Sequence, residues 1–261
     1  MSQIESGTRV ALVTGAATGI GAAISQRLAQ NGYTVLVADI NLAAAHATAE
    51  QINTSGQRSG QGRAAALAMD VSNAESIAQA FANVSKEYGR CDVLVNNAGI
   101  AKTFPFLEFP LDNWLLTMSI NLTGVMLCGQ HAARMMVTHK WGRIINISSI
   151  SGVRASGGRT AYGTSKAAVM GLTRQMAIEL AEHGITVNSV APGPIDTPLT
   201  QVLHSPQARK NFTAAVPLQR YGSTDEIAAA VAFLASDDAA YITGHTLPVD
   251  GGFLAAGVLE I

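Results

Sequence analysis

Short runs of β-branched and aliphatic residues alternate with longer alanine-rich stretches along almost the whole chain. Each run suits a buried strand, and each alanine-rich stretch suits a helix of several turns. Strands and helices that alternate through short connections form right-handed βαβ units with a parallel sheet. The alternation therefore predicts an α/β fold of the Rossmann type, with a doubly wound, seven-stranded parallel sheet and helices on both faces.

This pattern places seven strands and six helices. The expected strands are 9–14, 34–38, 64–69, 92–96, 143–147, 186–190 and 246–249. The expected helices are 20–31, 42–55, 74–88, 111–138, 161–182 and 224–235. Seven strands fit one doubly wound domain, and no linker rich in proline or serine divides the chain. We therefore expect one dinucleotide-binding catalytic domain over residues 1–261.

The least regular segment runs from residue 192 to residue 221 and contains five of the eight prolines. Proline cannot continue the interior of a helix, so this segment should be a loop with short helices at most. A long irregular stretch inside a compact domain usually serves as a lid or a binding loop. We expect a substrate lid at about residues 193–221.

Composition excludes several classes of function. The net charge is −1 and no basic block is present, so nucleic acid is not an expected partner. No apolar run approaches the ~20 residues that span a bilayer, and the first ten residues, MSQIESGTRV, lack the apolar core of a signal peptide. The two cysteines and six histidines are scattered without metal-ligand spacing. We expect a cytoplasmic protein without membrane contact or a metal site.

The first expected strand ends in the glycine-rich stretch TGAATGIG, residues 14–21, and a helix follows at once. Glycines at Gly15, Gly19 and Gly21 let the backbone approach a pyrophosphate, and the helix N-terminus supplies free N–H groups. No Lys-Ser or Lys-Thr pair follows the last glycine, which argues against a P-loop. The stretch therefore predicts the phosphate site of a dinucleotide.

The second expected strand leads into Asp39, 18 residues after Gly21. This spacing is close to that of an acidic residue that binds the ribose 2′-hydroxyl. A carboxylate would repel a 2′-phosphate, so the residue favours NAD over NADP.

Tyr162 and Lys166 are four residues apart in AYGTSKAAV, so they share one face of the expected helix. An ammonium ion held beside a phenol favours the phenolate. Such a pair is a usable proton carrier for hydride transfer to or from a nicotinamide. Ser149 follows a strand 13 residues earlier, where its hydroxyl can donate to a substrate oxygen.

Six motifs in order now support a family assignment: TGAATGIG, NNAG (96–99), INISS (145–149), YGTSK (162–166), APGPIDT (191–197) and ITGHTLPVDGG (242–252). Together they resemble the short-chain dehydrogenases/reductases, over roughly residues 9–253. The similarity is strongest to the subgroup that holds 3-oxoacyl-carrier-protein reductases and NAD-dependent sugar, polyol or secondary-alcohol dehydrogenases.

The resemblance implies the residues of the site. Catalytic roles are implied for Asn121, Ser149, Tyr162 and Lys166, with Asn121 supporting a water relay to Lys166. Cofactor contacts are implied for Gly15, Thr18, Gly19, Ile20, Gly21, Asp39, Asp70, Val71, Asn97, Ala98, Gly99, Tyr162, Lys166, Pro192, Gly193, Ile195 and Thr197. A homotetramer is a further implication of the resemblance.

Three functions remain open at this point. The first is NAD-dependent oxidation of a secondary alcohol, polyol or sugar, with Tyr162 as general base. The second is an NADP-dependent 3-oxoacyl-carrier-protein reductase, and the third is a noncatalytic nucleotide-sensing protein that kept the fold. The partner of either enzyme is a small alcohol or ketone. Whether Arg154, Arg159 or His204 contacts that substrate stays open.

Overall fold

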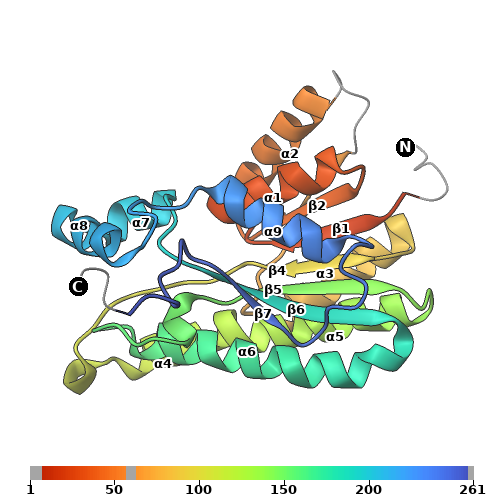
Figure 1. The fold of residues 1–261 in the computed structure, drawn as a ribbon. Helices are drawn as coiled ribbons and strands as arrows, with labels where there is room; N and C mark the ends of the chain where they lie inside the picture. The colour runs from red at the N-terminus through yellow and green to blue at the C-terminus, as the bar shows by residue number, and fades with distance from the viewer. Residues whose placement is uncertain (1–7, 57–62, 258–261) are drawn as a thin grey trace.

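The computed structural model describes residues 8–56 and 63–257. Seven parallel strands form one sheet in the order β3-β2-β1-β4-β5-β6-β7 (Figure 1). Residues 1–7, on which the expected lack of a signal peptide partly rests, lie outside the described residues. The strands are β1 (Val10–Thr14), β2 (Thr34–Asp39), β3 (Ala64–Ala68), β4 (Val93–Asn96), β5 (Gly142–Ile147), β6 (Ile185–Pro192) and β7 (Thr246–Val249).

Helices cover both faces of the sheet, which confirms the predicted fold (Figure 1). One face packs against α1 (Gly19–Gln30), α2 (Leu42–Gly56) and α9 (Thr224–Ala235). The other packs against α3 (Ala74–Tyr88), α5 (Gly124–Val137) and α6 (Thr160–Leu180). Among the helices of the described ranges, none is long and apolar enough to cross a membrane.

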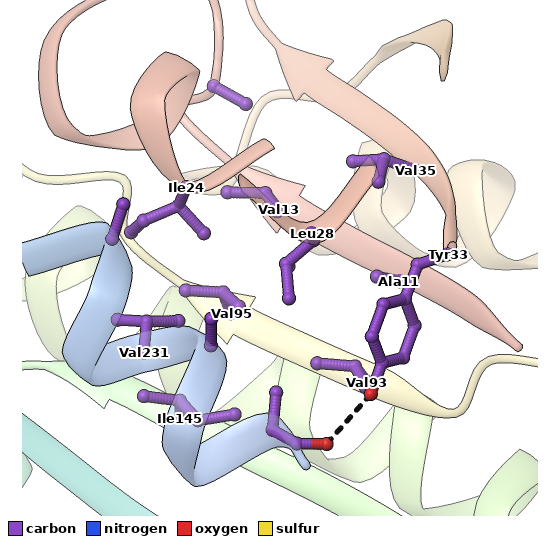
Figure 2. Packing of buried hydrophobic residues seen from close by; sticks show 14 of the residues in the cluster. Ala11, Val13, Ile24, Leu28, Tyr33, Val35, Val93, Val95, Ile145 and Val231 are labelled. Carbon is purple, nitrogen blue, oxygen red and sulfur yellow. Dashed lines mark hydrogen bonds between the residues drawn. The ribbon is translucent and has the colours of Figure 1, made fainter. Parts of the chain in front are cut away.

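Alternate residues of each strand supply the two layers of the core. Ala11 and Val13 of β1 face α1 and α9, whereas Val10 and Leu12 face the opposite layer. Figure 2 shows the first layer, where the Tyr33 hydroxyl donates a hydrogen bond of 3.0 Å to the buried carbonyl of Ala235. Burial on both faces explains why the strands read as continuous aliphatic runs in the sequence.

The long helix expected over 111–138 is interrupted in the structure. It consists of α4 (Leu111–Met118), one π-helical turn (Ser119–Thr123) and α5. The side chain of Asn121, within the π turn, bonds to the backbone of Ile100 instead of pointing to solvent. π-bulges of this kind occur frequently at functional sites.

The chain reverses its direction across the sheet between β1 and β4. After β1 it builds outward through β2 and β3, then returns to place β4 beside β1. The carboxyl ends of these strands therefore open a crevice, which is where doubly wound sheets bind ligands. The segment expected as a lid lies near this edge and holds two short helices, α7 (Pro198–Leu203) and α8 (Pro206–Ala215), which project from the body in Figure 1.

Candidate active site

A cavity of about 430 Å³ opens at the carboxyl ends of the strands. It extends from the first glycine turn past Asp39 and Asp70 to Tyr162 and the start of the lid. Of the residues expected at the site, Gly21 and Asn121 do not line it. Those that do are Gly15, Thr18, Gly19, Ile20, Asp39, Asp70, Val71, Asn97, Ala98, Gly99, Ser149, Tyr162, Lys166, Pro192, Gly193, Ile195 and Thr197.

The glycine turn is held by the loop after β4. The Asn97 amide donates hydrogen bonds of 2.9 Å to the carbonyls of Thr14 and Gly15. Gly15 has φ +61°, and a Cβ there would lie 2.8 Å from the Cα of Ala98. A Cβ at Gly21 would collide with the Gly15 carbonyl and with Asn97. Gly21 is therefore required by packing within the turn, which leaves the backbone and the start of α1 open to a diphosphate.

Two carboxylates lie beside the glycine turn. Asp39 Oδ2 accepts from the Ala17 N–H at 3.1 Å, and Oδ1 accepts from the Asn41 N–H at 2.9 Å. Asp70 Oδ1 is likewise held, by the N–H and hydroxyl of Ser72. Of the described residues that line the cavity, Lys166 is the one lysine or arginine. Both carboxylates thus lie at the strand ends, where a doubly wound sheet binds a dinucleotide.

Tyr162 and Lys166 project from α6 toward the end of β5. The Lys166 ammonium lies 5.8 Å from the centre of the Tyr162 ring and donates a 2.7 Å hydrogen bond to the Ile147 carbonyl. Lys166 is only 4% exposed, and this burial lowers its pKa from 10.5 to about 8. A buried cation is thus fixed beneath the phenol.

The structure distinguishes the two adjacent serines after β5. The Ser148 hydroxyl donates to the Val190 carbonyl at 2.9 Å and is thereby used within the sheet. Ser149 caps the next turn, where its hydroxyl accepts from the Ser151 N–H at 3.1 Å. Its O–H proton remains available to a ligand, and the side chain lines the cavity. Ser149 is therefore the better donor to a substrate oxygen.

Asn121 is fully buried and lies behind the cavity wall. Its amide accepts from the Ile100 N–H at 2.9 Å and donates to the Ile100 carbonyl at 3.0 Å and to the Ser165 hydroxyl at 3.1 Å. A Cβ built on Gly99 would lie 3.3 Å from Asn121 Oδ1 and 3.4 Å from Lys166 Nζ. Both side chains therefore border the space beside Gly99, where the family resemblance implies a water relay to Lys166.

Comparison with known proteins assigns the family. Residues 15–254 match the family model described as "Enoyl-(Acyl carrier protein) reductase". This match begins at Gly15, within the glycine turn, and includes the Tyr162–Lys166 pair. The chain belongs to the short-chain dehydrogenase/reductase family. It is thus an oxidoreductase of a family that binds nicotinamide cofactors.

Relatives within this family carry different names. The 3-oxoacyl-[acyl-carrier-protein] reductase of Aquifex aeolicus is 41% identical over 94% of this chain and 96% of its own. The cis-4-hydroxycyclohexanecarboxylate dehydrogenase of Sinomonas cyclohexanicum is 42% identical over 95% of this chain and 97% of its own. A gluconate 5-dehydrogenase of Burkholderia cenocepacia, solved with NADP and tartrate, superposes with a TM-score of 0.90 at 33% identity, covering 95% of this chain and 96% of that one.

The burial of Lys166 has a cost to the stability of the fold. Because its pKa is lower in the folded chain than in the unfolded one, the unfolded state binds more protons between pH 8 and pH 10.5. The ammonium therefore destabilises the fold below pH 8, and this penalty fades as the pH rises toward 10.5. A shift from 10.5 to about 8 corresponds to about 3 kcal/mol.

Replacing Lys166 with methionine should therefore stabilise the chain. We expect the free energy of unfolding at pH 7 to rise by about 2 kcal/mol, since the lost hydrogen bond to Ile147 offsets about 1 kcal/mol. The gain should shrink between pH 8 and pH 10. Urea unfolding without cofactor measures it, with Lys86→Met on the exposed face of α3 as the control. A destabilised Lys166→Met variant at pH 7 would contradict the pKa assignment.

Several residues of the cavity were not predicted from the sequence. Apart from Ser148, which adjoins Ser149, they are apolar or lie in the lid segment, and their only signal is a position at the end of a strand or beside a predicted residue. These residues are Ile40, Met69, Ile100, Ile120, Ile147, Ser148, Pro198, Leu199 and Thr200.

The sequence leaves open whether Arg154, Arg159 or His204 contacts the substrate. Arg154 is exposed, and its guanidinium carbon lies 5.2 Å from the centre of the Phe253 ring. Arg159 and His204 also lie outside the set of residues that line the cavity, but they contact each other next to Tyr162, which does line it.

Proposed function

We propose that this chain interconverts a ketone and a secondary alcohol, with NAD(H) as the hydride carrier and Tyr162 as the proton carrier. The observation that carries this proposal is the convergence of Tyr162, Lys166 and Ser149 at one end of a cavity whose other end fits a dinucleotide. A proton carrier, a fixed cation and a hydroxyl donor are what reversible carbonyl reduction requires of the protein.

Each side chain has a distinct task in this reaction. The nicotinamide, when bound, accepts or supplies the hydride. In oxidation Tyr162, as the phenolate, takes the proton from the alcohol; in reduction Tyr162, as the phenol, gives its proton to the ketone oxygen. The Ser149 hydroxyl donates to the same substrate oxygen and orients it, and Lys166 holds a positive charge close to the phenol as its oxygen becomes negative.

Asn121 acts on the reaction from behind the cavity wall. The side-chain amide of Asn121 is hydrogen-bonded to Ile100 and to Ser165, and its oxygen borders the space next to Gly99. We propose that protons pass from Tyr162 toward solvent through this space, past Lys166. Asn121 is thus a positioning residue in the proposal.

The cofactor preference rests on Asp39. Its carboxylate is fixed by two backbone N–H groups at the end of β2, where it can accept from ribose hydroxyls. No arginine or lysine among the described lining residues is placed to neutralise a 2′-phosphate there, because Lys166 belongs to the end of the cavity near Tyr162. These two facts support NAD over NADP.

The substrate class has two candidates. The comparisons favour 3-oxoacyl-[acyl-carrier-protein] reduction over oxidation of a polyol or sugar, because several curated relatives near 40% identity carry the reductase name. The Sinomonas enzyme, at 42% identity, is named as a dehydrogenase of a cyclic secondary alcohol. Alcohol oxidation therefore remains the second candidate. The homotetramer and the cytoplasmic location stay predictions.

A turnover screen tests the proposal. The purified chain should oxidise NADH with 3-oxoacyl thioesters or small ketones, or reduce NAD with secondary alcohols, and absorbance at the nicotinamide band follows either direction. Turnover with NAD or NADH on at least one class is the expected result. Absence of turnover on all classes with both dinucleotides, in protein that binds NADH, would favour a noncatalytic nucleotide-sensing role instead.

A further inference from the structure

Arg159 lies at the junction of the catalytic helix and the lid. It directly precedes α6, three residues before Tyr162, and its guanidinium lies 5.4 Å from the centre of the Tyr162 ring. One of its nitrogens lies 3.1 Å from Nε2 of His204, which directly follows α7. Leu199 and Thr200 of the same short helix line the cavity. Arg159 is thus near the reacting phenol, on the side where the lid meets it.

The partners of His204 define its tautomer. A guanidinium has donors and no acceptor, so Nε2 must accept from Arg159. Nδ1 then carries the proton and donates to the Tyr221 hydroxyl at 2.9 Å. His204 is 9% exposed and stacks on Phe212 at 4.9 Å. Burial, together with the charges of Arg159 and Arg209, lowers the pKa of His204 and keeps the ring neutral. The histidine orients Arg159 but does not neutralise it.

The charges around this junction are not balanced. Within the described residues, no carboxylate lies within ion-pair distance of Arg159. The neighbouring Arg209 lies over the Tyr221 ring at 4.2 Å and pairs with Asp196 at 3.2 Å. Its second terminal nitrogen is buried and has no hydrogen-bond partner in the part of the chain that the structure describes. Two guanidiniums and one carboxylate leave one positive charge in a half-buried setting, where an added anion would be stabilised.

We propose that Arg159 binds a carboxylate of the substrate, so that the chain selects hydroxy acids and oxo acids over neutral alcohols and ketones. This inference rests on the proposed reaction at Tyr162 and narrows its substrate. The fork of N–H donors left free by His204 matches a carboxylate, while Tyr162 and Ser149 hold the oxygen that reacts. A 3-oxoacyl thioester offers no carboxylate at this place, so the inference also separates the two substrate candidates.

Paired substrates test this assignment in the full chain. A panel of hydroxy acids is assayed with NAD, each beside the primary amide of the same carbon skeleton, and 3-oxoacyl thioesters are assayed with NADH. We expect kcat/KM for the best acid to exceed that of its amide by about 30-fold, mainly through KM. In Arg159→Gln the acid-to-amide ratio should fall to about threefold or less, and Arg159→Lys should recover part of it.

Arg154→Gln is the matched control, because it removes the same charge from the same loop at an exposed position. It should keep the wild-type ratio. NADH binding by Arg159→Gln should stay within about twofold of wild type, which shows that the variant is folded. An unchanged ratio in Arg159→Gln, or equal turnover of acids and amides by the wild type, would overturn the inference.

Failure of the inference can be told from failure of the proposed function. If thioesters or amides are turned over without preference for acids, only the carboxylate assignment falls. If nothing in the panel is turned over with NAD or NADH, or with NADP or NADPH in their place, both the reaction at Tyr162 and the assignment to Arg159 fall.

Discussion

Replacement of Tyr162 by phenylalanine is expected to lower kcat by about 10³-fold and to leave NADH binding within about twofold of wild type. The change removes one oxygen and keeps the ring, which lies 5.4 Å from the Arg159 guanidinium and 5.8 Å from the Lys166 ammonium. Since those contacts involve the ring, the fold of α6 and the cavity wall should persist. The loss should appear in kcat, because the phenol acts on the proton that moves in the reaction.

Steady-state kinetics on the best substrate and fluorescence titration with NADH measure the two effects. Tyr241→Phe is the control, since Tyr241 is fully exposed and distant in sequence from every residue of the cavity. If kcat of the Tyr162→Phe variant stays within about threefold of wild type, Tyr162 is not the proton carrier of the reaction.

Replacement of Asp39 by asparagine is expected to change the preference between NADH and NADPH by about 100-fold in favour of NADPH. Asparagine keeps the shape of the side chain but removes the charge that repels a 2′-phosphate. It also weakens the two hydrogen bonds from Ala17 and Asn41, because an amide offers one acceptor oxygen where the carboxylate offers two. Affinity for NADH should therefore fall as affinity for NADPH rises.

Dissociation constants for both dinucleotides, measured on the same preparation, give this ratio. Asp238→Asn supplies the control, since it makes the same change of net charge at an exposed position outside the cavity. If the ratio of the NADH and NADPH dissociation constants is the same in Asp39→Asn and wild type, Asp39 does not determine the preference between the two dinucleotides.

The sequence predicts the sheet well because its signals are local. The five inner strands of the sheet are short aliphatic runs that are buried along almost their whole length. Helix α9 occupies the predicted residues because Ser223 and Glu226 form a capping box at its start. The strand β6 is longer than expected. It continues to Pro192 because Pro192 pairs with Val249 at the strand end, where a missing N–H is tolerated.

Long-range contacts explain what the sequence alone does not predict. The π turn at Asn121 depends on the backbone of Ile100, 21 residues away, and no local pattern encodes that bond. The pairing of Arg159 with His204 joins residues 45 positions apart. The sequence places Arg159 close to Tyr162 and His204 in the expected lid. It does not show that His204 orients the Arg159 guanidinium beside Tyr162.

Paired binding titrations of NADH and NADPH to the wild-type chain are the most direct measure of the cofactor preference. We expect NADH to bind at least about tenfold more tightly, because the fixed carboxylate of Asp39 accepts from ribose hydroxyls and repels a 2′-phosphate. Tighter binding of NADPH would contradict it and would favour an NADP-dependent 3-oxoacyl-carrier-protein reductase.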